Sequence, residues 1–433
     1  MPARPRALGA LVALFTAGYL APYLLPTIVG RLSAGLALSA AQAGSVGSIL
    51  LLGSACAGLT LASRVERIGP RRAARLGLLA MVLGYGTAAA SGTLPPVVAG
   101  AVLGGFGSGT ATAVAAAGIA GRPDPHRAAT LGLLSVSATA GALYLGLPRL
   151  GGGHALPFAA IAGTAALVWP VTAWLPRATS GPERSASGPL PSRRAGAALA
   201  ASILCWSMAQ NALWGVSGRI GLTQAGLSEV TLGLVFAVAL GAGLAGVTVA
   251  GALGRRLGRT TPIGLGTVVI ALCVLLSSAA TSPSSFATGE ILWNAVYPVV
   301  LSYLLGLAAS LDPRGRWAVL VGSASSLGVA CGPLTGSLLS ETAGYPGMGL
   351  TLCALLLAVA IPMTAVSRHA DGRPLLPTLR GFSPTPPLPE LGASPQTPGR
   401  PAAVPSNAGR AGFSARRAKH RQPQSRPAEL QRR

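Results

Sequence analysis

The feature that most constrains this chain is a series of apolar segments, each about 20 residues long and nearly free of charge. A segment of that length crosses a bilayer as an α-helix, which satisfies its backbone hydrogen bonds internally. The segments are continuous and do not alternate, so they predict helices and not barrel strands. We predict twelve spans, at approximately 8–30, 43–63, 73–91, 95–120, 128–148, 155–175, 196–217, 230–253, 260–281, 284–309, 316–339 and 345–366.

Composition agrees with a polytopic membrane protein embedded in a lipid bilayer. Hydrophobic residues make up 51% of the chain and charged residues 10%, whereas soluble domains average roughly a quarter charged. The net charge of +23 comes from arginines in short loops and in the C-terminal tail, so it predicts membrane orientation and no nucleic-acid partner. The five cysteines lie in apolar segments without a CxxC pair, which argues against a disulfide or metal framework, and no cofactor is predicted.

Arginine is unevenly distributed between alternate connections. One set of connections is rich in arginine, and the opposite set holds only scattered charges such as Arg149 and Glu341. By the positive-inside rule the first set is cytoplasmic. The sequence therefore predicts a multi-pass protein of the cytoplasmic (cell inner) membrane, with both termini in the cytoplasm and a first helix that is retained rather than cleaved.

The two halves repeat each other at an offset of 188 or 189 residues. GRL at 30–32 matches GRI at 218–220, and ERIG at 66–69 matches RRLG at 255–258. DPHR at 124–127 resembles DPRGR at 312–316, and both aspartates are predicted helix N-caps followed by proline. We therefore predict an all-α fold of two six-helix bundles, with the domains 1–175, cytoplasmic linker 176–195, 196–366 and a disordered basic tail at 367–433.

The loop after the second predicted span carries a motif, and the loop after the eighth carries a second copy of it. In the first copy Ala62, Glu66, Arg67, Gly69, Arg71 and Arg72 resemble the Gly-x-x-x-Asp-Arg-x-Gly-Arg-Arg signature of the major facilitator superfamily. The resemblance implies that fold and a cytoplasmic latch that includes Glu66. Glu66 replaces the usual Asp, and Arg255 stands where the second copy would carry an acid. The predicted gate residues are Glu66, Arg67, Gly69, Arg71, Arg72, Arg255, Arg256, Gly258 and Arg259.

Patterns typical of the proton-coupled drug exporters of that superfamily are not matched. Ala101 occupies a position where those exporters commonly have arginine, and the fifth span lacks a Gly-Pro pair. A GxxxGPxxxG pattern lies instead in the eleventh span, with Pro333 at its centre. Prolines such as Pro22, Pro26, Pro298 and Pro333 are predicted places for helices to bend.

Glu290 is the one acidic side chain that clearly lies inside a predicted span, in GEILWNAVYP. Charge inside a span is costly and is a functional hypothesis by default. Trp293, Asn294 and Tyr297 follow at helical spacing and predict one wall of a substrate cavity. We predict that Glu290 couples transport to protons; the alternatives are a structural acid near the outer headgroups and an ion pair with Arg219.

The resemblance implies that helices one, four, seven and ten line a central cavity. Gln210, Asn211 and Trp214 in the seventh span, and Tyr19 and Tyr23 in the first, are the further predicted cavity residues. Hydrogen bonds that only hold the bundle together are the alternative for these side chains. Arg31 and Arg219, at equivalent outer ends, either gate the cavity, bind an anion or extend to the lipid headgroups.

These observations predict a monomeric secondary active transporter that moves a small organic solute by alternating access, with proton coupling, as symporter or antiporter, left open. An uncoupled facilitator and a transporter-like receptor or scaffold remain alternatives. An enzyme is not predicted, because the four histidines are scattered, and no GxxxxGK[ST] loop supports nucleotide-driven transport. The scarcity of charge favours neutral or moderately hydrophobic solutes over multiply charged ones.

Overall fold

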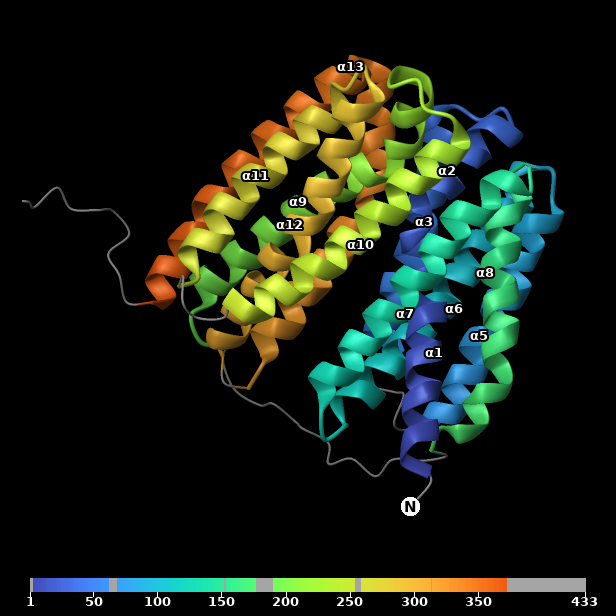
Figure 1. The fold of residues 1–433 in the computed structure, drawn as a ribbon. Coiled ribbons are helices and arrows are strands. Elements are labelled where there is room, and N and C mark those ends of the chain that lie inside the picture. The colour runs from blue at the N-terminus through green and yellow to red at the C-terminus, as the bar shows by residue number, and fades with distance from the viewer. Residues whose placement is uncertain are drawn as a thin grey trace, which may run out of the picture. The chain divides into compact units, whose positions relative to one another are not determined.

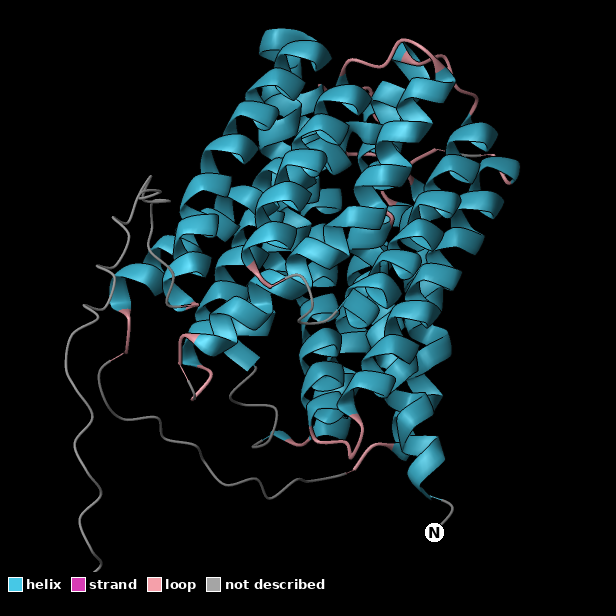
Figure 2. Ribbon diagram, turned by 60° about the vertical axis from the view of Figure 1, so that its left-hand side comes forward, coloured by secondary structure: helices cyan, strands magenta, loops and turns pink. Residues whose placement is uncertain are grey.

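The structure, a computed structural model, describes residues 3–61, 68–151, 153–176, 190–253, 258–312 and 314–371. This part of the chain is helical and contains no strand (Figure 2). Residues Met1–Pro377 form one compact unit that holds every described helix. The elements are α1 (Ala3–Tyr23), α2 (Leu25–Gly35), α3 (Ala40–Leu61), α5 (Pro70–Ala90), α6 (Leu94–Ala120), α7 (Pro125–Gly146), η1 (Leu147–Arg149), α8 (Ala155–Val168), η2 (Trp169–Trp174), α9 (Arg193–Arg219), η3 (Ile220–Gln224), α10 (Glu229–Leu253), α11 (Thr260–Ser278), α12 (Pro283–Ser310) and α13 (Arg316–Ala370).

The described helices supply the twelve predicted spans. Nine are long and apolar enough to cross a bilayer, or ten when the bent pair α1 and α2 counts as one span. α13 is 55 residues long but breaks at Gly344, where φ is 68°, so it comprises two spans. α9 is less apolar than the others because polar side chains such as Gln210 and Asn211 interrupt it.

The first span bends where prolines predict it. α1 and α2 meet at an angle of 48°. Pro26, in the first turn of α2, has no N–H, so the carbonyl of Pro22 four residues earlier has no helical partner. The indole Nε1 of Trp214 on α9 donates to that carbonyl at 3.1 Å. A bend encoded by proline thus creates a hydrogen bond between the two halves of the chain.

Two groups of helices lie side by side in Figure 1, α1 to α8 and α9 to α13. They meet where α3 packs against α13, α7 against α10, and α2 against α9. We call the end with the α2–α3, α5–α6 and α11–α12 connections the distal end, and the end with the α6–α7 and α12–α13 connections the proximal end. The first helix begins at the proximal end (Figure 1).

The two predicted N-caps have different outcomes. Asp124 caps α7 as predicted, with Oδ1 accepting from the backbone N–H of Arg127 at 3.0 Å and Pro125 as the first helical residue. The prediction for Asp312 is wrong, because α13 begins at Arg316 and its cap is Gly315. Gly315 has a φ of 73°, a left-handed conformation that glycine adopts without strain. The extra residue of DPRGR compared with DPHR moves the helix start beyond the aspartate.

Candidate functional site

Glu290 lies two turns into α12 and has no exposed surface. Ser217 of α9 donates its hydroxyl to Glu290 Oε1 at 2.8 Å. Glu290 Oε2 and the Ser277 hydroxyl are both buried and have no hydrogen-bond partner in the described structure. An ionised carboxylate is expensive to bury without a cation or a full set of donors. The burial and incomplete hydrogen bonding of Glu290 therefore single it out among the described acids.

The described residues do not form the alternative ion pair between Glu290 and Arg219. Arg219 Nη1 is buried and has no partner there. Ser217 and Arg219 are two residues apart on α9, which corresponds to about 200° around a helix. Because Ser217 faces Glu290, Arg219 faces away from α12. The rotation of α9 separates the two charges even though they are close in the sequence.

Gln210 of α9 is hydrogen-bonded to Trp293 of α12, three residues after Glu290. Its Oε1 accepts from the indole Nε1 of Trp293 at 2.9 Å, and its Nε2 donates to the carbonyl of Trp206 at 3.2 Å. Gln210 is fully buried. The amide of Gln210 is thus occupied by the protein, which fits the predicted alternative of an interhelical hydrogen bond and orients the ring of Trp293.

Aromatic rings form a continuous cluster on α9 and α12. Trp206 stacks on Tyr297 with ring centroids 5.3 Å apart and an interplanar angle of 11°. The ring centroid of Trp293 lies 5.6 Å from that of Trp214 and 6.3 Å from that of Tyr297. The sequence reasoning missed Trp206, although it precedes Gln210 by one helical turn and shares its face. Three further rings extend the cluster and were also missed: Tyr144, Phe236 and Phe286.

The two predicted asparagines are partly free. Asn211 Nδ2 donates to the carbonyl of Ser207 at 2.9 Å, and Asn294 Nδ2 donates to the carbonyl of Glu290 at 3.0 Å. Each amide nitrogen is therefore bound to its own helix. Neither amide oxygen accepts a hydrogen bond from another described residue. Neither oxygen is a fully buried atom that lacks a partner. Both asparagines are partly exposed.

The predicted tyrosines of the first helix, Tyr19 and Tyr23, both have contacts in the structure. The ring of Tyr19 contacts Phe15 at a centroid distance of 4.5 Å, and the carbonyl of Tyr23 accepts from the hydroxyl of Tyr144 at 2.6 Å. The structure therefore joins the predicted cavity residue Tyr23 to the aromatic cluster through Tyr144.

Charged groups join the two bundles at the distal end. Arg31 donates to Glu229 Oε2 at 3.0 Å and to the carbonyls of Leu147 and Gly151 at 3.1 Å each. Glu341 Oε1 accepts from the backbone N–H of Ala41 at 2.8 Å. Arg31 is thus engaged across the bundles instead of extending to the headgroups. A cavity of about 80 Å³ is lined in part by Arg31, Glu229 and Tyr144.

Small residues join the bundles next to these charges. Ser48 Oγ of α3 accepts from the backbone N–H of Leu334, the residue after Pro333, at 2.9 Å. Gly44 and Gly47 of α3 lie so close to α13 that a Cβ atom at either position would contact Ser337 or Pro333 at 3.3 Å or less. We call the contacts that Arg31, Gly44, Gly47, Ser48 and Glu341 make with the other bundle the distal contacts.

The predicted gate motif is described only in part, since Ala62, Glu66, Arg67, Arg255 and Arg256 lie outside the described residues. Gly69 and Gly258 have φ values of 88° and 65°, as the predicted tight turns require. Arg71 Nε is buried and has no hydrogen-bond partner in the described chain, whereas Arg72 is exposed. Arg259 donates to Ser310 Oγ at 2.8 Å. The latch itself stays a prediction.

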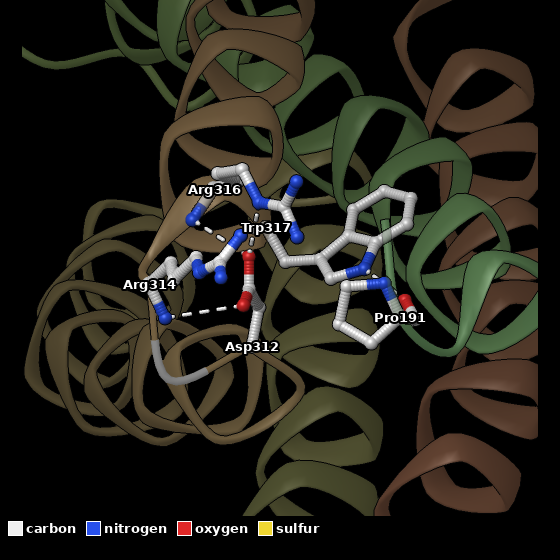
Figure 3. A network of polar contacts seen from close by, with 5 residues as sticks. All are labelled: Pro191, Asp312, Arg314, Arg316 and Trp317. Atoms are coloured by element: carbon white, nitrogen blue, oxygen red, sulfur yellow. Dashed lines mark hydrogen bonds and ion pairs between the residues drawn. The ribbon is translucent and has the colours of Figure 1, made fainter. Parts of the chain in front are cut away.

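Asp312 organises the proximal start of α13 (Figure 3). Its Oδ2 accepts from Arg316 Nε at 2.7 Å and its Oδ1 from the backbone N–H of Arg314 at 3.1 Å. Next to it, Trp317 Nε1 donates to the carbonyl of Pro191 at 2.7 Å, which ties the residues before α9 to α13. The hydrogen bond from Arg316 holds the pKa of Asp312 below its usual value.

Asp312→Asn is therefore expected to lower the melting temperature at neutral pH. The depressed pKa means that the ionised Asp312 stabilises the fold above its ordinary pKa near 3.9, and that this stabilisation is lost as pH falls through the folded-state pKa. The difference between variant and wild type should shrink below about pH 4. Thermal unfolding of the purified protein at both pH values measures this, with the exposed Asp371→Asn as the control. An equal melting temperature at pH 7 would contradict the prediction.

The comparisons with known proteins agree with this arrangement. The family model of the Major Facilitator Superfamily matches residues 7–316. The structure of the human organic anion transporter MFSD10 (TETRAN) is similar at a TM-score of 0.61 and 19% identity, covering 84% of this chain and 100% of that one. A D-xylose-proton symporter is similar at a TM-score of 0.67 and 14% identity, covering 82% and 96%. No curated protein matches the chain.

Two groups of membrane-length helices packed against each other define a multi-pass membrane protein. The chain belongs to the major facilitator superfamily. The family and the structural neighbours identify a transporter of small solutes and not an enzyme. No cluster of His, Cys, Asp or Glu that could hold a metal lies among the described residues.

Proposed function

We propose that the protein is a secondary active transporter of the cytoplasmic membrane that moves a small organic solute by alternating access and exchanges a proton at Glu290. Both termini are cytoplasmic in this proposal, so the distal contacts close the outer side. The substrate cavity comprises Tyr19, Tyr23, Gln210, Asn211, Trp214, Trp293, Asn294 and Tyr297.

The observation that supports the proposal is that Glu290 lies close to the contact between the two bundles. Ser217, which binds Glu290, precedes Gly218, and a Cβ at Gly218 would lie 2.8 Å from the carbonyl of Pro26 in the other bundle. Opening the distal contacts would change the surroundings of this carboxyl. A buried carboxyl without a cation favours its neutral form, and water or a cation favours the ionised form. Such a change links proton binding to bundle movement.

The test is solute-driven proton movement in proteoliposomes that contain a pH-sensitive dye. Pooled sugars, amino acids, organic acids and amphiphilic amines are presented outside, and internal pH is followed with protein-free liposomes as the control. Proton movement that depends on both solute and protein supports the proposal. Radiolabelled solute flux without proton movement would establish the alternative of an uncoupled facilitator. Absence of any solute flux would favour a receptor or scaffold.

A further inference from the structure

The rings of the aromatic cluster and the polar groups around them carry partial negative charge. The faces of aromatic rings carry partial negative charge and attract cations. Trp206, Trp293 and Tyr297 are joined in one cluster, with the amide oxygens of Asn211 and Asn294 on the same two helices free to accept. Rings and carbonyl oxygens together suit a ligand that donates hydrogen bonds or carries positive charge.

The ionisable group near the cluster has the same sign when it is charged. Along α1, α9 and α12, which carry the predicted cavity residues, Glu290 is the only charged side chain away from the helix ends. Its Oε2 is buried and lacks a partner in the described chain. Arg31 is engaged by Glu229 and two carbonyls, and Arg219 lies at the end of α9 on the side opposite to Glu290. Neither arginine is placed to neutralise the carboxyl of Glu290.

We infer that the solute is a monovalent organic cation with an apolar portion, held by the rings of Trp206, Trp293 and Tyr297 and attracted by Glu290. This inference rests on the proposed transport function and names its substrate class. The single acid matches a single positive charge, and a multiply charged solute would leave charge uncompensated in the membrane interior. An organic anion has no basic partner at this depth on these three helices, which separates the chain from the organic anion transporter that it resembles in fold.

The test compares three probes of the same shape and different charge. Isothermal titration at pH 7 measures binding of 3-phenylpropylamine (cation), 3-phenylpropanol (neutral) and 3-phenylpropanoate (anion) to the full-length protein in lipid nanodiscs, with empty nanodiscs subtracted. We expect the amine to bind about tenfold more tightly than the other two, which corresponds to about 1.4 kcal/mol of binding free energy. Glu290→Gln and Tyr297→Leu should each reduce that selectivity severalfold.

Tyr303→Leu is the matched control, because Tyr303 lies on the same helix six residues further, about 240° around it. It should retain the selectivity of the wild type. Equal binding of the alcohol, tighter binding of the carboxylate or no saturable binding of any probe would overturn the inference. Amine selectivity without solute flux in proteoliposomes would sink the transport proposal alone, whereas flux of a neutral solute without amine selectivity would sink only this inference.

Discussion

Gly44→Leu is expected to prevent closure of the distal end and to slow solute flux by at least about tenfold. A Cβ atom at position 44 of α3 would lie 2.2 Å from Ser337 Oγ and 2.7 Å from the carbonyl of Pro333 on α13. Contacts this short with a helix backbone cannot be relieved by rotating a side chain. The larger leucine side chain therefore forces the bundles apart at the distal end.

The measurement is the distance between spin labels at Thr93, just before α6, and Ser284, in the first turn of α12, both at the distal end, in a cysteine-free background. Gly44→Leu should shift the distance distribution to longer values. Gly58→Leu is the matched control, because Gly58 lies on the same helix and a Cβ there has no atom within 4 Å. A wild-type distance distribution with wild-type flux in Gly44→Leu would refute the role of this contact.

Glu290→Gln is expected to abolish solute-driven proton movement. Glutamine keeps the size of the side chain and an oxygen that accepts from Ser217, but it cannot release a proton. If coupling proceeds through Glu290, proton movement should fall at least about tenfold, while solute counterflow at saturating solute and without a pH gradient should fall much less. The dye-loaded proteoliposome assay and radiolabelled counterflow measure the two quantities on the same preparation.

Glu290→Asp controls for the ionisable group. A carboxylate one methylene shorter should restore part of the proton movement, because the titrating group is kept and only its distance to Ser217 changes. Unchanged proton movement in Glu290→Gln would show that coupling uses another group or none, and would leave Glu290 as a structural acid.

The contacts of the GxxxGPxxxG pattern could be predicted only in part. The sequence locates it in the eleventh span but does not say what it touches. In the structure Gly328, Gly332 and Gly336 face α9, where a Cβ at each would contact Leu204, Asn211 or Ala212 at 2.5 Å or less. The N–H after Pro333 bonds instead to α3 of the other bundle. One short motif therefore serves contacts within a bundle and between bundles, which its spacing alone does not predict.

The sequence by itself determined the twelve spans, the repeat of two six-helix halves and the membership of the major facilitator superfamily. These follow from local properties, since the apolar length of each segment and the charge of each loop are read along the chain. Only the tertiary structure decided that Ser217 binds Glu290, that Arg219 faces away from it, that Arg31 pairs with Glu229 and that Trp206 joins the site. These facts depend on how each helix is rotated and which segments meet, and packing between distant helices sets both.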